Sequence, residues 1–297
     1  MTKTDSSDSE VAANPLDRAI DHKARRKAFW RFLTFIGLSV GLIVVLMTLL
    51  SLLGQDAEMS LSNIAIVQVS TAAIIVLATG IMVRATGEPA TYFGWGQSRR
   101  LRQFGIGAAS GLGLMSLMLA VMMVFGGISF SAEALNFGDL LINTAVFGAI
   151  FILTAIAEEG LLRGYGFVQL ARALSFWPAA ILSSVVFAAL HLGNTSETPM
   201  GVGAVVVVGL VLAYSFRRSG ALWFAWGYHA AWDFAESFIY GVPDSGVVMP
   251  GALLQPSFHG ADWLTGGSAG PEGSLLVLPA LALLAIIAHV SMKPTTT

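Results

Sequence analysis

The chain has 297 residues, of which 55% are hydrophobic and only 11% are charged, and its formal net charge is −2. Soluble domains carry about 25% charged residues, so this composition excludes an ordinary water-soluble fold and predicts a protein embedded in lipid. Cysteine is absent, which excludes disulfides, thiolate metal ligands and cysteine nucleophiles.

The N-terminal segment differs from the rest of the chain in composition. Residues 1–28 are polar and charged, and they lack the apolar run and the small-residue cleavage site of a signal peptide. We therefore expect residues 1–28 to form a disordered cytoplasmic tail. Residues 29–293 are expected to form the transmembrane domain.

Apolar stretches define the predicted spans. A helix that crosses the hydrocarbon core needs about 20 apolar residues. The predicted fold class is an all-α, polytopic transmembrane helical bundle of about eight spans, of which the fifth and sixth are the shortest. The eight stretches are 30–53, 60–83, 104–126, 140–162, 177–193, 200–216, 220–240 and 274–292.

The basic residues predict the orientation of the chain, because Lys and Arg accumulate in cytoplasmic loops. All sixteen Lys and Arg residues fall on the same side of the predicted spans as the N-terminus. The loops on the other side, 54–59, 127–139, 193–199 and 241–273, contain acidic residues but no base. Both termini are therefore expected in the cytoplasm.

Glycines inside the third predicted span have two readings. The run GIGAASGLG resembles a phosphate-binding loop, but no strand is predicted before it and no Lys-Ser/Thr pair follows it. Small residues spaced four apart, such as Gly107 and Gly111, are instead typical of close helix packing in membranes. We expect this span to pack tightly against another helix.

Ionisable residues inside the predicted spans are few and concentrated in the second half of the chain. Each costs at least about 2.5–3.5 kcal/mol to insert into a membrane, so each marks a functional hypothesis. Glu236 lies close to the end of its span and is expected at the exit of the helix. The set is Glu158, Glu159 and Arg163 in AEEGLLRGYGF, His191 in FAALHLGN, and His229, Asp233 and Glu236 in YHAAWDFAE.

Helical geometry predicts that four of these side chains meet. If the fourth span continues as one helix to a turn near Ser175, Glu158 stands 17 residues before that turn and His191 stands 16 residues after it. In an antiparallel helix pair both then lie at the same depth. His229 lies roughly 15 Å into the seventh span, and Asp233 follows one turn later on the same face.

The same residues form three ordered motifs that resemble those of a known family. They are EE-xxx-R (Glu158, Glu159, Arg163), F-xxx-H (Phe187, His191) and H-xxx-D (His229, Asp233). The pattern resembles the CPBP (Abi) family of intramembrane proteases, which includes type II CAAX prenyl proteases and proteins linked to bacteriocin processing or immunity. The resemblance covers about residues 140–240, the expected catalytic core. In the prenyl-protease branch the third motif usually ends in Asn, so Asp233 leaves the use of prenylated CAAX substrates open.

The resemblance implies an intramembrane endopeptidase in which Glu158 activates the attacking water. In one mechanism His191, His229, Asp233 and Glu158 hold Zn²⁺, whose bound water ionises near neutral pH. In the other there is no metal: Glu158 and His191 orient the water, while His229 and Asp233 assist the oxyanion. Asp is a poor oxyanion donor and a natural metal ligand, which favours Zn²⁺ slightly.

Glu159 also belongs to the candidate catalytic set, but its spacing favours another role. Glu159 and Arg163 are four residues apart in the favourable acid-before-base order, so we expect an ion pair that braces the helix. Glu158 has Leu162 at the corresponding position and therefore has no such partner.

The expected partners are the lipid bilayer and a membrane-embedded or membrane-associated peptide or protein substrate, and no nucleic acid. The resemblance implies a multi-pass protein of a bacterial plasma membrane with its site open to the cytoplasmic side. The alternative function is a non-catalytic immunity or scaffold protein in which the polar cluster braces helices. A transporter is disfavoured, because no inverted repeat is evident and the first three predicted spans lack ionisable residues near their centres.

Overall fold

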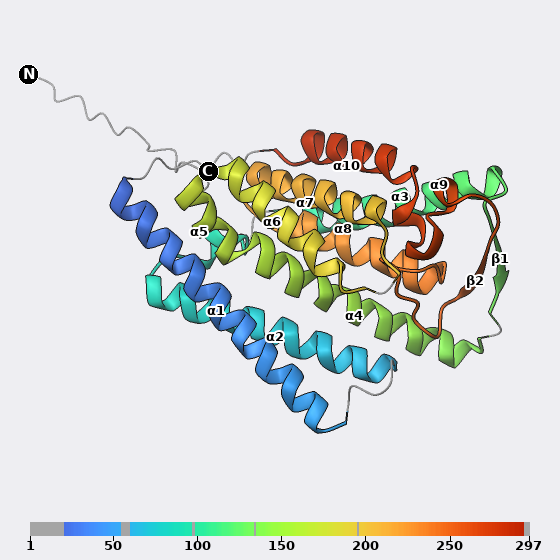
Figure 1. Cartoon of the computed structure of the whole chain (residues 1–297), viewed down its shortest axis with the longest axis horizontal. Coiled ribbons are helices and arrows are strands. Elements are labelled where there is room, and N and C mark those ends of the chain that lie inside the picture. The colour runs from blue at the N-terminus through green and yellow to red at the C-terminus, as the bar shows by residue number, and fades with distance from the viewer. Residues whose placement is uncertain (1–20, 55–59, 97–98, 134, 195, 294–297) are drawn as a thin grey trace, which may run out of the picture.

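The computed structural model describes residues 21–54, 60–96, 99–133, 135–194 and 196–293, which form a bundle of long helices (Figure 1). Three short 3₁₀ turns, at Ala90–Phe93, Gly267–Ala269 and Pro271–Gly273, lie between the helices. The α-helices are α1 (His22–Leu52), α2 (Leu61–Thr86), α3 (Arg100–Val124), α4 (Phe137–Arg163), α5 (Tyr165–Leu174), α6 (Phe176–His191), α7 (Pro199–Ser219), α8 (Trp223–Asp233), α9 (Asp262–Thr265) and α10 (Val277–Ser291).

Each of the eight apolar stretches contains a helix, so the prediction of a helical membrane bundle is confirmed in its coarse form. Five helical stretches of the described chain are long and apolar enough to cross a membrane: α1, α2, α3, α4 together with α5 (Phe137–Leu174), and α7. α6 and α10 are shorter, with 16 and 15 residues. The count of about eight spans and the cytoplasmic placement of both termini remain predictions.

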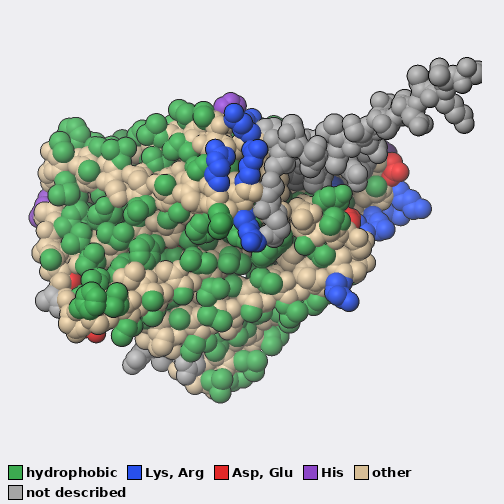
Figure 2. All heavy atoms as spheres, turned by 180° about the vertical axis from the view of Figure 1, so that it is seen from behind, with side chains coloured by type: hydrophobic (Ala, Val, Ile, Leu, Met, Phe, Trp, Pro, Cys, Tyr) green, Lys and Arg blue, Asp and Glu red, His purple; other side chains and the backbone are tan. Residues whose placement is uncertain are grey.

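The surface has the character expected of a protein in lipid. Apolar side chains cover much of the face in Figure 2, and the Lys and Arg side chains visible there lie between the middle and the right-hand end of the view. Large apolar side chains are exposed along helices from both halves of the chain. They include Val44, Leu77, Val124, Ile152, Val186 and Ile286.

Two details of the predicted organisation are wrong. α1 begins at His22, so residues 22–28 are helical and not part of a tail; Asp21 caps this helix by accepting a hydrogen bond from the Ala24 amide at 2.7 Å. Residues 1–20 lie outside the described part of the chain. The fold also contains an antiparallel pair of strands, β1 (Ile128–Ala132) and β2 (Leu254–Phe258), which the predicted all-α fold class does not include.

The fourth span is not one continuous helix. α4 ends at Arg163, Gly164 adopts a non-helical conformation (φ −82°, ψ −133°), and α5 begins at Tyr165. The Tyr165 ring packs against Phe35 at 5.4 Å and Phe93 at 4.5 Å, which fixes α5 against α1 and the first 3₁₀ turn. The assumption behind the depth comparison of Glu158 and His191 is therefore wrong, because the helix is interrupted between them.

Glycine packing positions α8, as predicted for the third span. A Cβ on Gly107 would lie 2.8 Å from the Tyr228 nitrogen, and one on Gly111 would lie 2.8 Å from the Trp232 nitrogen. On the facing helix, a Cβ on Gly227 would lie 3.0 Å from the Ala108 nitrogen. The backbones of α3 and α8 are therefore in direct contact, which small residues alone permit.

α8 does not end in an ordinary turn. It continues directly into a π-helical segment, η2 (Phe234–Ile239), in which the Tyr240 amide donates to the Ala235 carbonyl at 2.9 Å. Segments of this kind are rare and occur frequently at functional sites. Here the segment starts immediately after Asp233.

Candidate active site

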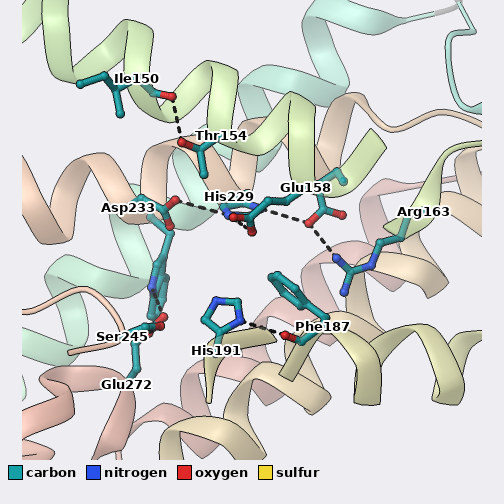
Figure 3. A network of polar contacts seen from close by, with 12 residues as sticks. Ile150, Thr154, Glu158, Arg163, Phe187, His191, His229, Asp233, Ser245 and Glu272 are labelled. Carbon is teal, nitrogen blue, oxygen red and sulfur yellow. Dashed lines mark hydrogen bonds and ion pairs between the residues drawn. The ribbon is translucent and has the colours of Figure 1, made fainter. Parts of the chain in front are cut away.

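A cavity of about 340 Å³ lies between α4, α6, α7 and α8. Four predicted site residues line it: Glu158 from α4, His191 from α6, and His229 and Asp233 from α8. Figure 3 shows His191 facing Glu158 and His229 across the opening. The structure thus brings together the four side chains that were expected to meet, although the helix leading to α6 is broken.

Glu159 lies at the centre of a buried network behind the cavity. Its side chain is completely buried, and Oε1 accepts hydrogen bonds from Arg163 Nη1 and from His229 Nδ1, both at 3.0 Å. The predicted ion pair with Arg163 is confirmed. Of the two adjacent glutamates, Glu158 lines the cavity, with 37% of its side chain exposed, whereas Glu159 positions His229.

His229 has an acidic group beside each ring nitrogen. Its Nε2 lies 3.3 Å from Asp233 Oδ2 and 3.7 Å from Glu158 Oε2, while Nδ1 contacts Glu159. The predicted alignment of His229 with Asp233, one turn later, is confirmed. Carboxylates only accept hydrogen bonds, so the ring donates through Nδ1 to Glu159 and its Nε2 faces the cavity carboxylates.

His191 is oriented by its own helix. Its Nδ1 lies 2.9 Å from the Phe187 carbonyl oxygen, and because a carbonyl only accepts, Nδ1 carries the hydrogen. A neutral ring then leaves Nε2 with a lone pair. The ring also makes an edge contact with Phe187, at 4.7 Å between centroids.

Phe187 links the first two motifs. The Arg163 guanidinium lies 4.5 Å from the centroid of the Phe187 ring, in a cation–π contact. α7 leaves room for this guanidinium at Gly209, where a Cβ would lie 2.6 Å from Arg163 Nη2. The Phe of F-xxx-H thus contacts both the brace on α4 and the histidine of its own motif.

Three acidic residues near the cavity form a group that the sequence did not predict. One carboxylate oxygen each from Glu236, Asp244 and Glu272 lies within 4.8 Å of the others. Glu236 lies in η2, just beyond the end of α8, and its side chain is fully buried. Burial raises the pKa of Asp244 well above its usual value, and the neighbouring Asp233 and Glu272 raise it further.

Nothing in the spacing of these residues signals the group, because Asp244 and Glu272 lie in a long loop without periodicity. The two predicted ligand histidines do not belong to it. Among the described residues, this trio is the set of three His, Asp or Glu side chains whose possible metal-ligand atoms all lie within 4.8 Å of one another. The proposed set of Glu158, His191, His229 and Asp233 is more widely spaced.

These features define a class of protein: a polytopic helical membrane protein with a buried Glu/His/Asp site beside a cavity. Residues 139–235, about a third of the chain, match the family model described as Type II CAAX prenyl endopeptidase Rce1-like. This match, over the same part of the chain, agrees with the resemblance to the CPBP (Abi) family that the three motifs carry. No curated protein and no solved structure matches the chain.

Proposed function

We propose that the protein is an intramembrane endopeptidase that hydrolyses a peptide bond of a membrane-associated substrate. One observation carries this proposal: Glu158, His191, His229 and Asp233, from three separate motifs and three helices, line a single cavity. A volume of about 340 Å³ falls within the range of ligand sites, roughly 300–1,000 Å³.

In this mechanism Glu158 is the general base. Its carboxylate is the exposed one of the adjacent pair, so it reaches water in the cavity, and it takes a proton as the water attacks the carbonyl carbon. The proton then passes from Glu158 to the leaving amine. His191 orients the same water, because its Nε2 lone pair accepts one of the water hydrogens.

His229 stabilises the tetrahedral oxyanion. Its Nε2 donates to the oxyanion when the ring is protonated, while Nδ1 stays bound to Glu159. A donor held in place before the reaction needs no reorganisation as charge develops. Asp233, at 3.3 Å from Nε2, holds the ring in the same orientation and supports its charge.

Zn²⁺ held by His191, His229, Asp233 and Glu158 is the competing proposal for how the water is activated. The metal would lower the pKa of a bound water. In both histidines the hydrogen is on Nδ1, so the Nε2 lone pairs would be free to bind the metal. A histidine that binds a metal usually donates its other ring N–H to an acceptor in this way. The wider spacing of these four residues supports the metal-free mechanism.

The test uses the purified full-length protein in detergent or lipid and a panel of membrane-associated peptides, both prenylated and unprenylated. We expect cleavage by the wild type and a loss of at least about 100-fold in Glu158→Gln and His191→Ala. His289→Ala is the matched control, because His289 contacts Tyr214 outside the cavity. Cleavage that persists in both site variants overturns the proposal, and loss of cleavage on chelation, restored by Zn²⁺, favours the metal mechanism.

The non-catalytic alternative has one observation in its favour: Glu159, Arg163 and His229 cross-link α4 to α8 as a structural brace would. If the polar cluster serves only this purpose, the wild type cleaves none of the peptides, and Glu158→Gln lowers the melting temperature. A Glu158→Gln variant that keeps its melting temperature but loses cleavage excludes this alternative.

A further inference from the structure

The acidic group of Glu236, Asp244 and Glu272 joins three separate segments of the chain. Glu236 lies in η2, Asp244 in the following loop, and Glu272 in the 3₁₀ turn Pro271–Gly273. Asp244 and Glu272 also line the cavity, and the cavity-lining residues of the described chain include no Lys or Arg. Three carboxylates therefore approach one another in a place where no basic side chain lines the adjoining cavity.

Two of the three carboxylates have hydrogen-bond donors. Glu272 accepts from Trp232 Nε1 at 2.9 Å and from Ser245 Oγ at 2.6 Å, and Figure 3 shows Ser245 beside Glu272. Asp244 accepts from Ser237 Oγ at 3.3 Å. These contacts fix the two acidic side chains at the edge of the cavity.

Glu236 is the exception, and it points to a ligand. Its side chain is completely buried, yet neither Oε1 nor Oε2 has a hydrogen-bond partner of ordinary geometry among the described residues, because the nearby Trp232 Nε1 donates to Glu272. A buried carboxylate without a partner is strongly unfavourable. Because the Glu236 oxygen lies within 4.8 Å of the other two acids, the unpartnered group faces the centre of the trio.

A divalent cation between the three carboxylates would neutralise their mutual repulsion and would give Glu236 the partner that it lacks. The donors are all carboxylate oxygens, which favours a hard cation over Zn²⁺ or copper. Ca²⁺ binds oxygen at 2.3–2.6 Å, so ligands on opposite sides of it lie about 5 Å apart, and the trio fits within that span. Ca²⁺ also accepts irregular geometry, whereas Mg²⁺ requires a near-ideal octahedron.

We propose that Glu236, Asp244 and Glu272 form a Ca²⁺ site at the wall of the cavity, distinct from the Glu158 and His229 site. The ion ties η2 to the two loop segments that follow it. It thereby fixes the segment that closes the cavity beside Asp233.

Binding is measured on purified full-length protein, stripped with EDTA, by titration calorimetry and by the melting temperature in detergent. We expect one Ca²⁺ per chain with a dissociation constant of about 10⁻⁴ to 10⁻³ M, and a melting temperature that rises with Ca²⁺ concentration. Glu236→Gln and Asp244→Asn should each weaken binding at least tenfold. Asp262→Asn is the matched control, because Asp262 is an exposed acid of the same C-terminal region.

Three results overturn the site: no saturable Ca²⁺ binding by the wild type, a melting-temperature rise that persists in Glu236→Gln, or equal weakening in Asp262→Asn. The first would mean that the three carboxyl groups share protons instead. A response to Mg²⁺ without one to Ca²⁺ overturns the assignment of the ion. The wild-type titration remains decisive even if a variant fails to fold, and none of these readouts depends on peptidase activity.

Discussion

Glu159 Oε1 accepts a hydrogen bond from His229 Nδ1 and another from Arg163 Nη1, each at 3.0 Å, and the Glu159 and Arg163 side chains are fully buried. This one oxygen joins α4 to α8 and fixes the orientation of the histidine that faces the cavity. A motif read along one helix therefore acts by positioning a residue of another helix.

Glu159→Gln should lower both stability and activity. The substitution leaves the Arg163 guanidinium buried without its counter-charge, which costs about 3–5 kcal/mol. The free energy of unfolding is compared with that of Glu88→Gln, which breaks partly exposed ion pairs with Arg31 and Arg172 and should cost about 1 kcal/mol. If the two variants lose the same free energy of unfolding, the buried ion pair contributes no more to stability than the partly exposed ones.

The α3–α8 contact should be sensitive to a single methyl group. Gly111→Ala places a Cβ against the backbone of Tyr228 and Trp232 and should destabilise the fold by about 1–3 kcal/mol. Because α8 carries His229, cleavage should fall as well. Gly113→Ala is the control on the same helix, where a Cβ meets nothing within 4 Å, and it should be neutral or stabilise by up to about 1 kcal/mol. Similar melting temperatures for the two variants would contradict the close contact.

Stability should depend on pH through Glu197, which lies in the loop before α7. Burial raises the pKa of Glu197 above its ordinary value of 4.5, against the opposing hydrogen bond from the Thr198 amide, and Glu272 raises it further. The folded protein thus holds this proton more tightly than the unfolded chain. The contribution of Glu197 to folding stability is therefore complete below its pKa in the unfolded chain and is lost as pH rises through its raised pKa in the folded protein.

Glu197→Gln removes that loss. Near pH 4 the variant and the wild type should have the same melting temperature. Towards about pH 8 the variant should melt at a progressively higher temperature than the wild type. Glu133→Gln, a change of another partly exposed acid, controls for the altered net charge. A difference that does not vary with pH would contradict the role of burial at Glu197.

Asp233→Asn separates the two proposed mechanisms. An amide oxygen can replace the carboxylate oxygen that faces His229 Nε2, so the metal-free mechanism predicts that cleavage stays within about tenfold of the wild type. Loss of a metal ligand should instead reduce cleavage by more than about 100-fold and lower the bound zinc measured by elemental analysis. The same variant, tested on prenylated peptides, shows whether Asp233 sets substrate choice.

Part of the fold could be predicted from the sequence because the constraint is local. Each membrane helix needs its own apolar run, and the runs were visible. The break at Gly164 was not, because it depends on the packing of Tyr165 against Phe35 and Phe93, which are distant in sequence. The strands β1 and β2 were missed since they occur in loops whose pairing is long-range.

The site divides in the same way. Contacts four residues apart, Glu159 with Arg163 and His229 with Asp233, followed from helical geometry. The contact between Glu159 and His229 did not, because the sequence does not determine how helices are rotated about their axes. Asp244 and Glu272 were out of reach, since no periodic element carries them to the cavity.

The π-helical segment η2 has a consequence for how such a chain can change. A π-turn accommodates one extra residue, and in a regular α-helix each residue turns the chain by about 100°. Deleting one residue between Asp233 and Tyr240 would therefore let the segment return to an α-helix while the chain beyond it keeps its orientation, whereas the same deletion in a regular helix would rotate the chain beyond it by that angle. Lineages of this protein should therefore tolerate the loss of one residue in η2 more readily than the loss of one residue from a regular helix such as α3.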